Sequence, residues 1–530
     1  MLNTIESKSG QKTVSINGVL LHSAYDPEKE ARRFVTEAIG KKSPALIFLL
    51  GAGIGYVGKA LKERFPEAKL ICMYYSTPLY EQSFCRGEIN WHPQAGTDVA
   101  DFLYARLSEP DLEGLEYIEW PPCGKSFSKL SGQVHKALHQ VIRELNGSVV
   151  TTAGAGRLWI KNTFYNFLHL DNIMGGSPCT KTLPIVIMAS GPSLEQSYPL
   201  VKKHRNNFSL WALPSALGYC RQHDILPDLV VVTDPGYYSA YHFYGSGLRR
   251  LRLAMPLSAC RGLWTIQDSV FLFAQDTFFE RAVLASLGHR LPLVPSNGTV
   301  AGSALLLALA YSVQPVVLLG LDMCFKDVFS HARPAAFQEL LYHSSLRTAP
   351  YLGGLYGRVV GTAPPKGKNT AYRTSSAYAT YAGWFSRLPA ETRKRIFRVH
   401  PSPVDLPGIG SMDEIQLAKH FRPRHNKSAH NSSLPLRPYP AFRQRKTILA
   451  SVLRDWLDSL NQELTAPFPL RQPLVRELLY FICTQKLLEY KRCLRLEGPD
   501  RAKTLGGSLI RETADFLRRL KRKITAEDTA

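Results

Sequence analysis

An apolar run that begins at Ile185 leads into Gly191-Pro192-Ser193-Leu194, where small residues and a hydroxyl stand together. A glycine lets the backbone turn tightly at the end of a strand, and a proline suits the first position of a helix. The exposed amides of such a helix start, together with the Ser193 hydroxyl, favour a phosphate group. The sequence therefore predicts an anion-binding turn here, although a plain strand-to-helix turn would use the same residue types.

Two carboxylates follow other apolar runs of strand length. Asp234 comes directly after Leu229–Thr233, and Asp322 comes three residues after Val316–Leu319. The carboxyl ends of parallel strands meet at one edge of a sheet, and in doubly wound folds ligands bind at that edge. We therefore expect both carboxylates on the same edge as the glycine turn, although a helix or turn cap would equally explain Asp322.

A polar segment and a histidine complete the candidate site. Asn297, Gly298 and Thr299 precede an uncharged helical pattern and offer an amide, a hydroxyl and backbone donors. His331 is the nearest histidine downstream of Asp322, and a histidine that titrates near neutral pH can remove a proton from a hydroxyl. A surface or structural role would also explain this histidine.

Two arginines lie close to these residues in the sequence. Arg333 and Arg373 could neutralise a leaving phosphate through paired hydrogen bonds, or they could be exposed basic residues. The sequence contains no Asp-x-Asp pair of the kind that holds a metal ion beneath a sugar nucleotide, so we expect no metal site.

The candidate residues lie in a segment where strand and helix patterns alternate, which favours a doubly wound parallel sheet. Five strands are predicted in it, at Leu183–Ala189, Phe208–Ala212, Leu229–Thr233, Val270–Phe273 and Val316–Leu319. The run 294–321 has no charge, but Pro295 and Pro315 interrupt it, so we predict a buried helix at about 300–312 and a strand rather than a membrane span.

The fold class is therefore α/β, and four segments are predicted. These are a smaller Rossmann-like α/β domain at 1–150, a central Rossmann-like parallel-sheet domain at 151–405, a linker at 406–440 and a basic helical region at 441–530. In the first domain, Gly53-x-Gly55-x-x-Gly58 follows a predicted strand, but the next strand ends at Tyr74-Tyr75-Ser76 without the acid that would contact a ribose. We expect a vestigial or acceptor-positioning domain there.

Charge is concentrated near the C-terminus of this 530-residue chain, which has a net charge of +22. Residues 421–530 hold 22 Lys and Arg against 11 Asp and Glu, and the helical patterns there run over 445–460, 474–494 and 510–524. The Lys and Arg residues are not interleaved with aromatic residues, so we expect a protein partner rather than nucleic acid, although a solvated helical face would also explain the charge. Nine scattered cysteines and a polar N-terminus favour a cytoplasmic protein without a disulfide framework.

Taken in order, these motifs resemble those of the motility-associated factor (Maf) glycosyltransferases. The resemblance spans roughly 40–400 and also includes Gly53-x-Gly55-Tyr56 and the segment from Trp159 through Asn162 to Asn166. Members of that family have a central domain described as 6-hydroxymethylpterin diphosphokinase MptE-like, which resembles bacterial sialyltransferases. The resemblance implies transfer of a nonulosonic, sialic-acid-like sugar from a CMP-activated donor to Ser or Thr of flagellin, in support of flagellum assembly and motility, without a metal or another cofactor.

The resemblance also implies roles for single residues. Gly191, Pro192, Ser193 and Leu194 would hold the nucleotide phosphate, and Asp234, Asn297, Gly298 and Thr299 would border the donor pocket. Asp322 would lie at the floor of that pocket as a candidate catalytic residue. Sialyltransferases of that type carry a histidine as general base, yet the comparable stretch 368–374 has none, which leaves His331 as the candidate. Two alternatives stay open: pyrophosphoryl transfer to a pterin alcohol, or a non-catalytic flagellin-binding protein.

Overall fold

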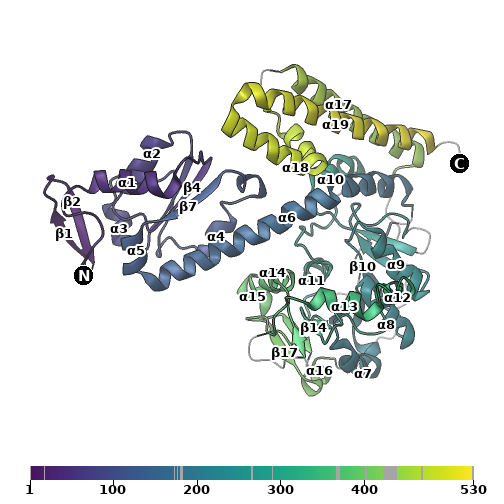
Figure 1. Cartoon of the computed structure of the whole chain (residues 1–530). Coiled ribbons are helices and arrows are strands. Elements are labelled where there is room, and N and C mark those ends of the chain that lie inside the picture. Colours follow the sequence, from purple (N-terminus) through teal and green to yellow (C-terminus); the bar gives the residue numbers. More distant parts are fainter. Residues whose placement is uncertain are drawn as a thin grey trace. The chain divides into compact units, whose positions relative to one another are not determined.

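The computed structural model describes the chain except for residues 1, 17, 172, 176, 179–182, 264–266, 289, 366–370, 400–402, 422–438, 467–469 and 528–530. The described residues form two compact units. The first contains Met1–Gly154 and Ser459–Phe516, and the second contains Ala155–Asp458 and Leu517–Ala530. Figure 1 shows the long helix α6 (Ser128–His169). The boundaries between the two units fall within α6, α17 (Phe442–Thr465) and α19 (Pro499–Ala526).

The second unit is built on one sheet, in which the described residues form eight strands, all parallel. In spatial order these are β12 (Gln267–Leu272), β11 (Leu251–Met255), β10 (Leu229–Val231), β9 (Ser209–Ala212), β8 (Ile185–Met188), β13 (Val316–Leu319), β16 (Ile396–Val399) and β17 (Gly410–Met412). The central strands are buried along their whole length, as expected for a parallel sheet covered on both faces. The α/β fold class is confirmed.

Helices connect these strands and cover the sheet. They are α7 (Leu194–His204), α8 (Leu217–Gln222), α9 (Tyr237–Ser246), α10 (Phe278–Leu284), α11 (Val300–Tyr311), α12 (Ala336–His343), α13 (Tyr351–Val359), α14 (Ser376–Ser386), α15 (Ala390–Arg393) and α16 (Glu414–His420). A small antiparallel pair, β14 (Phe325–Lys326) and β15 (Tyr372–Arg373), stands apart from the sheet. The uncharged run 294–321 forms the buried helix α11 and strand β13, as predicted. None of the described helices is long and apolar enough to span a bilayer.

The first unit has its own parallel sheet, in the order β6 (Ile89–Trp91), β5 (Lys69–Met73), β4 (Leu46–Leu50) and β7 (Leu115–Glu119). A smaller antiparallel sheet contains β1 (Leu2–Glu6), β2 (Lys12–Ile16) and β3 (Val19–Leu20). The helices here are α1 (Pro27–Ile39), α2 (Tyr56–Arg64), α3 (Thr77–Gln82), α4 (Val99–Tyr104), α5 (Pro121–Ser126) and the first part of α6. The predicted strand-glycine-helix-strand unit is present as β4, α2 and β5.

The C-terminal region is helical, as predicted, and its helices are α17, α18 (Pro473–Glu497) and α19. α18 belongs to the first unit, whereas α17 and α19 each contribute residues to both units, and the domain boundaries stay a prediction. The structure also differs within 406–440, where β17 joins the main sheet and α16 follows it. Gly410-Ser-Met412 is too short and too polar to show as a strand in the sequence, and the rest of that segment from 422 to 438 lies outside the described residues.

Candidate functional site

The candidate site lies where the order of the strands reverses. The chain runs from β8 through β9, β10 and β11 to β12 on one side, and then returns to place β13 on the other side of β8. The loops that follow β8 and β13 therefore flank the switch point, where open α/β sheets bind their ligands. The Gly191 amide donates a 2.7 Å hydrogen bond to the carbonyl of Gly320, which joins the two loops directly.

Two glycines make this approach feasible. A Cβ atom on Gly191 would stand 2.5 Å from the Gly320 carbonyl oxygen and 2.6 Å from Oδ2 of Asp322, closer than real atoms come. Gly320 has a φ of +63°, and a Cβ there would stand 2.6 Å from the carbonyl oxygen of Ala189. The contact between the two loops therefore requires glycine at both positions. The sequence had suggested only that Gly191 allows a tight turn.

Asp322 occupies the turn that we expected to bind a phosphate. Its carboxylate accepts a 2.6 Å hydrogen bond from the Ser193 amide and a 2.5 Å hydrogen bond from the Ser193 hydroxyl, and the side chain is only 3% exposed. We predicted Pro192 as the first residue of the helix, but α7 begins at Leu194. The Leu194 amide donates a hydrogen bond to the Gly191 carbonyl. The amides of this turn and the hydroxyl are therefore already satisfied by protein groups.

The largest influence on the pKa of Asp322 is its burial. Burial raises the pKa of Asp322, and the two hydrogen bonds from Ser193 and the positive charges of Arg398 and Lys326 oppose that rise. Arg398 is itself 5% exposed on β16 and donates to the carbonyl of Val404, while its pKa is lowered by burial. A buried carboxylate and a buried guanidinium thus stand at adjacent strand ends, where each favours the charged form of the other.

His331 lies in a loop that crosses the same turn. The Ala332 amide donates a 2.7 Å hydrogen bond to the Ser190 carbonyl, which fixes the loop beside the end of β8. The Nδ1 atom of His331 stands 2.7 Å from the Ser330 hydroxyl. Burial, with smaller contributions from His242 and Arg358, lowers the pKa of His331 to about 4, so the imidazole is neutral near pH 7.

The two arginines suggested by the sequence have protein partners. Arg333 forms an ion pair with Glu195 at 3.2 Å, and its amide donates to the same carboxylate at 3.0 Å. Arg373 donates to the hydroxyl and the carbonyl of Thr362. Besides Arg398, Lys326 approaches the site and interacts with both Asp322 and Glu195, and Arg358 interacts with His331. Nothing in their local sequence distinguishes these two residues.

Asn297 and Thr299 form the cap of α11. The Thr299 hydroxyl accepts from the Gly302 amide at 2.9 Å, and Oδ1 of Asn297 accepts from the Thr299 amide at 3.1 Å. Gly298 lies between them with a φ of +80°. This arrangement positions the buried helix α11, while the role of the segment in binding a donor stays a prediction.

Asp234 stands at the end of β10, two strands from β8. Its side chain is accessible, yet the surrounding protein reduces its hydration and raises its pKa. Asn162 of α6 donates to the Pro235 carbonyl of this turn at 2.9 Å, and Asn166 of α6 donates to the carbonyls of Leu257 and Ala259 in the loop after β11. Both asparagines are fully buried, and the bond from Asn162 to Pro235 joins the motif from Trp159 to Asn166 to the Asp-Pro-Gly turn.

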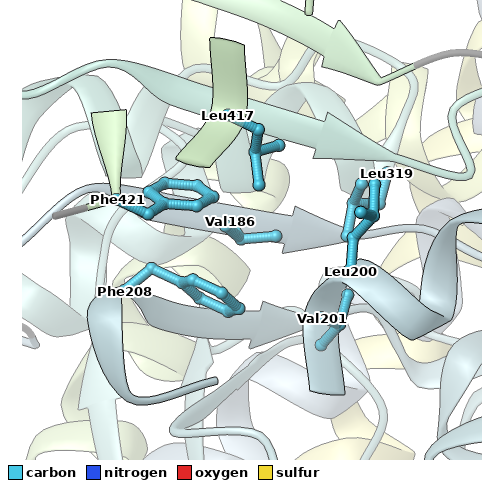
Figure 2. Close-up of a pocket in the computed structure, with 7 residues that line it drawn as sticks. All are labelled: Val186, Leu200, Val201, Phe208, Leu319, Leu417 and Phe421. Carbon is cyan, nitrogen blue, oxygen red and sulfur yellow. The ribbon is translucent and has the colours of Figure 1, made fainter. Parts of the chain in front are cut away.

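An apolar gap lies apart from these polar groups. Figure 2 shows seven side chains around it: Val186 and Leu319 of the sheet, Leu200 and Val201 of α7, Leu417 of α16, Phe208 just before β9 and Phe421 just after α16. The rings of Phe208 and Phe421 pack with centroids 5.0 Å apart. The gap belongs to the packing of these helices on the sheet. Among the described residues, no group of three His, Cys, Asp or Glu side chains is placed to hold a metal ion.

The glycine turn of the first unit is filled by protein. His22 lies against it, because a Cβ on Gly53 would stand 2.6 Å from Nε2 of the imidazole. The same ring stacks on Trp120 at 5.2 Å and meets Tyr56 edge-on at 5.0 Å. The strand order reverses between β4 and β7, so His22 and Trp120 stand where a nucleotide would bind in a fold of this kind.

Comparison with known structures identifies the fold. The structure is similar to that of the MAf glycosyltransferase from Magnetospirillum magneticum AMB-1, with a TM-score of 0.61 over 99% of this chain and 92% of that chain. The chain has the fold of a Maf glycosyltransferase. The two sequences are 13% identical, and the predicted resemblance to this family is confirmed as a shared fold that extends beyond 40–400 to the C-terminal helices.

Sequence comparisons agree with this fold. Residues 159–328 match the family model described as 6-hydroxymethylpterin diphosphokinase MptE-like. Two uncharacterized proteins of Treponema pallidum (strain Nichols) are similar to this Maf-fold chain. One is 24% identical over 61% of this chain and 70% of its own length, and the other is 27% identical over 48% of this chain and 45% of its own length.

Proposed function

We propose that this chain is a glycosyltransferase that moves a nonulosonic sugar from a CMP-activated donor to Ser or Thr of flagellin, in support of flagellum assembly and motility. The observation that carries the proposal is the contact at the switch point, where Gly191, Ser193, Gly320 and Asp322 join the loops after β8 and β13. The Maf glycosyltransferase fold over the whole chain supports the same reaction class.

His331 is the general base in this proposal. The acceptor oxygen forms a bond to the anomeric carbon of the sugar, and its proton passes to Nε2 of His331. The bond between that carbon and the phosphate oxygen breaks, and CMP leaves with the electron pair. Because Nδ1 is occupied by Ser330 and the ring is neutral near pH 7, Nε2 is the nitrogen that can take the proton.

Asp322 has a positioning role in this scheme. Its two oxygens are bound by Ser193, so the carboxylate does not reach a substrate but keeps the two loops together. We assign neutralisation of the charge on the leaving phosphate to Lys326, which interacts with Asp322, and to Arg358, which interacts with His331. The donor nucleotide would lie against the solvent-facing side of the turn Gly191–Leu194. Asp234 and the segment Asn297–Thr299 would border it.

One specific observation favours a second function. The family model that matches residues 159–328 takes its description from pyrophosphoryl transfer to a pterin. That chemistry uses ATP with Mg²⁺ held near its phosphates, whereas sugar transfer from a CMP donor needs neither. The two reactions therefore differ in nucleotide and in metal requirement.

Ligand-dependent unfolding of the full chain separates these functions. We expect CMP to raise the melting temperature in the presence of EDTA, and ATP with Mg²⁺ to leave it unchanged. Release of CMP from a CMP-nonulosonic acid in the presence of flagellin, undiminished by EDTA, is the expected activity. Stabilisation by MgATP and consumption of 6-hydroxymethylpterin would favour the kinase instead. Binding of flagellin without CMP release under all conditions would show a non-catalytic protein.

A further inference from the structure

The candidate base His331 is approached from several elements of the second unit. Ser330, its neighbour in the chain, places its hydroxyl 2.7 Å from Nδ1 of the imidazole. His242 of α9 and Arg358 of α13 interact with the imidazole electrostatically. The side chain of Tyr378 in α14 hydrogen-bonds with that of Ser330. The Ser330 hydroxyl therefore stands between a phenol and an imidazole.

Tyr378 is held in this position by packing. Its ring centroid lies 5.2 Å from that of Phe325 in β14 and 6.5 Å from that of Tyr381. Thr374, two residues before α14, donates through its hydroxyl to the Met323 carbonyl at 3.1 Å. Because Met323 and Phe325 both lie in the segment between β13 and α12, the start of α14 is fixed to the segment that carries the candidate base.

The same helix also meets the segment Asn297–Thr299. A Cβ on Gly298 would stand 4.0 Å from Cε1 of Tyr381, which is ordinary van der Waals contact. Tyr378 and Tyr381 are three residues apart in α14 and so share one face of it. One face of α14 therefore contacts both Ser330 and the segment that is proposed to border the donor.

The hydrogen bond at Nδ1 decides which nitrogen of the neutral imidazole can take a proton. Ser330 has one hydroxyl proton, which it donates to one partner at a time. If that proton goes to Nδ1, the imidazole carries its own proton on Nε2 and is no base at that atom. If it goes to the phenolic oxygen of Tyr378, a lone pair of Ser330 accepts the Nδ1 proton and Nε2 stays free.

We propose that Tyr378 is a positioning residue, which accepts the Ser330 hydroxyl proton and thereby holds the proton of His331 on Nδ1. This inference rests on the proposed function, in which Nε2 takes the proton of the acceptor. Burial raises the pKa of Tyr378, so the phenol is uncharged near pH 7 and acts as a hydrogen-bonding group rather than as an anion. The side chain is half-buried, so its own hydroxyl proton has access to water.

The test observes the ring nitrogens of His331 by NMR, in the full chain labelled with nitrogen-15 histidine at pH 7, without nucleotide, sugar or flagellin. The signals of His331 are identified by their absence in His331→Gln. The unaltered chain should have a protonated Nδ1 and an unprotonated Nε2. Tyr378→Phe keeps the ring and removes the phenolic oxygen, so Ser330 can donate to Nδ1 instead. The two nitrogen resonances should then shift toward each other as the tautomers mix.

Three further variants separate the hydrogen bond from packing. Tyr381→Phe removes a phenolic hydroxyl from the same face of α14 and should leave the His331 resonances unchanged. Ser330→Ala should mix the tautomers, and adding Tyr378→Phe to it should cause no further shift, because Tyr378 acts through Ser330. Ser330→Thr keeps the hydroxyl and should keep the single tautomer. In the transfer assay, Tyr378→Phe should lower kcat by about tenfold and leave the KM for the donor unchanged.

Two outcomes would overturn the inference. A proton on Nε2 in the unaltered chain would contradict the direction of the hydrogen bonds. Resonances that are the same in Tyr378→Phe as in the unaltered chain would show that Tyr378 only packs. Because the spectra are recorded without donor or acceptor, failure of this inference is distinguishable from failure of CMP-dependent stabilisation and CMP release, which test the reaction itself.

Discussion

The Asp322 carboxylate is bound by both the amide and the hydroxyl of Ser193, at 2.6 and 2.5 Å, across 129 residues of sequence. The sequence of this turn resembles a phosphate-binding site, but in the structure its donors bind Asp322 and so lock the loops after β8 and β13 together. The buried Asp322 carboxylate therefore has hydrogen-bond donors, without which its burial would be strongly unfavourable.

This contact predicts different costs for two substitutions in the turn. Ser193→Ala should lower the free energy of unfolding by about 1–3 kcal/mol, because one hydrogen bond to a buried carboxylate is lost. Gly191→Ala should cost more, since its Cβ would meet the Gly320 carbonyl at 2.5 Å and the loops would have to separate. Denaturant unfolding of the full chain measures both, with the exposed Ser344→Ala as control. A Gly191→Ala chain as stable as that control would refute the lock.

The pH profile of sugar transfer reports on His331. A histidine with an ordinary pKa of 6.5 is about nine-tenths protonated at pH 5.5 and would lose most of its activity as a base. The pKa of His331 is lowered to about 4, so its neutral form should persist and the acid limb of kcat should fall below pH 5.5.

Arg358 gives a control for this assignment. It interacts with His331 and lowers its pKa, so Arg358→Gln should move the acid limb to higher pH while the base remains. His331→Ala should abolish the limb together with most of the activity, by about a hundredfold or more for a general base. An acid limb near pH 6.5, unmoved in Arg358→Gln, would assign the base to another group.

The sequence predicted the central strands because each is a continuous apolar run, and Val316–Leu319 matches β13 residue for residue. It missed β16, where the buried Arg398 interrupts the apolar pattern, and it placed the start of the last helix at Ile510 although α19 begins at Pro499. Gly506 and Gly507 conceal the helical pattern in the first turns of α19.

The candidate site was predictable only in part. Strand ends placed Gly191 and Asp322 at one edge of the sheet, and the structure joins them. The use of the Ser193 donors by Asp322, and the approach of Lys326 and Arg358, depend on contacts between distant segments that no local pattern records.

His22 makes the stability of the chain depend on pH. Burial lowers its pKa to about 3 in the folded chain, while the unfolded chain titrates near 6.5. Below pH 6.5 the unfolded chain therefore binds a proton that the folded chain refuses. From this group the free energy of unfolding should fall with decreasing pH by up to about 1.4 kcal/mol per unit.

The variant His22→Leu removes this titration and keeps a side chain of similar size between Trp120 and Tyr56. Unfolding measured from pH 7 to 4.5 should show a shallower acid dependence for the variant, by about one proton. His92→Leu, at a histidine on the rim of the same sheet, is the comparison. Identical slopes in all three chains would show that His22 is hydrated or paired in solution.

The last prediction concerns α17, which we expected to belong to a separate C-terminal region. In the second unit, Trp456 is 3% exposed, and its ring centroid lies 5.5 Å from that of Phe164 and 5.3 Å from that of Phe278. Arg445 is also buried, and it donates to the Leu170 carbonyl at 2.6 Å and to Asp171 at 2.5 Å. The first half of α17 is therefore part of the core that supports α6 and α10.

Trp456→Ala should consequently lower the free energy of unfolding by about 3–5 kcal/mol, the usual cost of deleting a buried aromatic side chain. Arg454→Ala, two residues away on the exposed side of the helix, should change it by less than about 0.5 kcal/mol. Truncation at Pro440 removes both Trp456 and Arg445, so it should cause partial unfolding and weaker CMP binding rather than loss of acceptor binding alone. A truncated chain that keeps its cooperative unfolding transition and its CMP affinity would show that α17 is dispensable for the second unit, and would restore the interpretation of the C-terminus as an independent region.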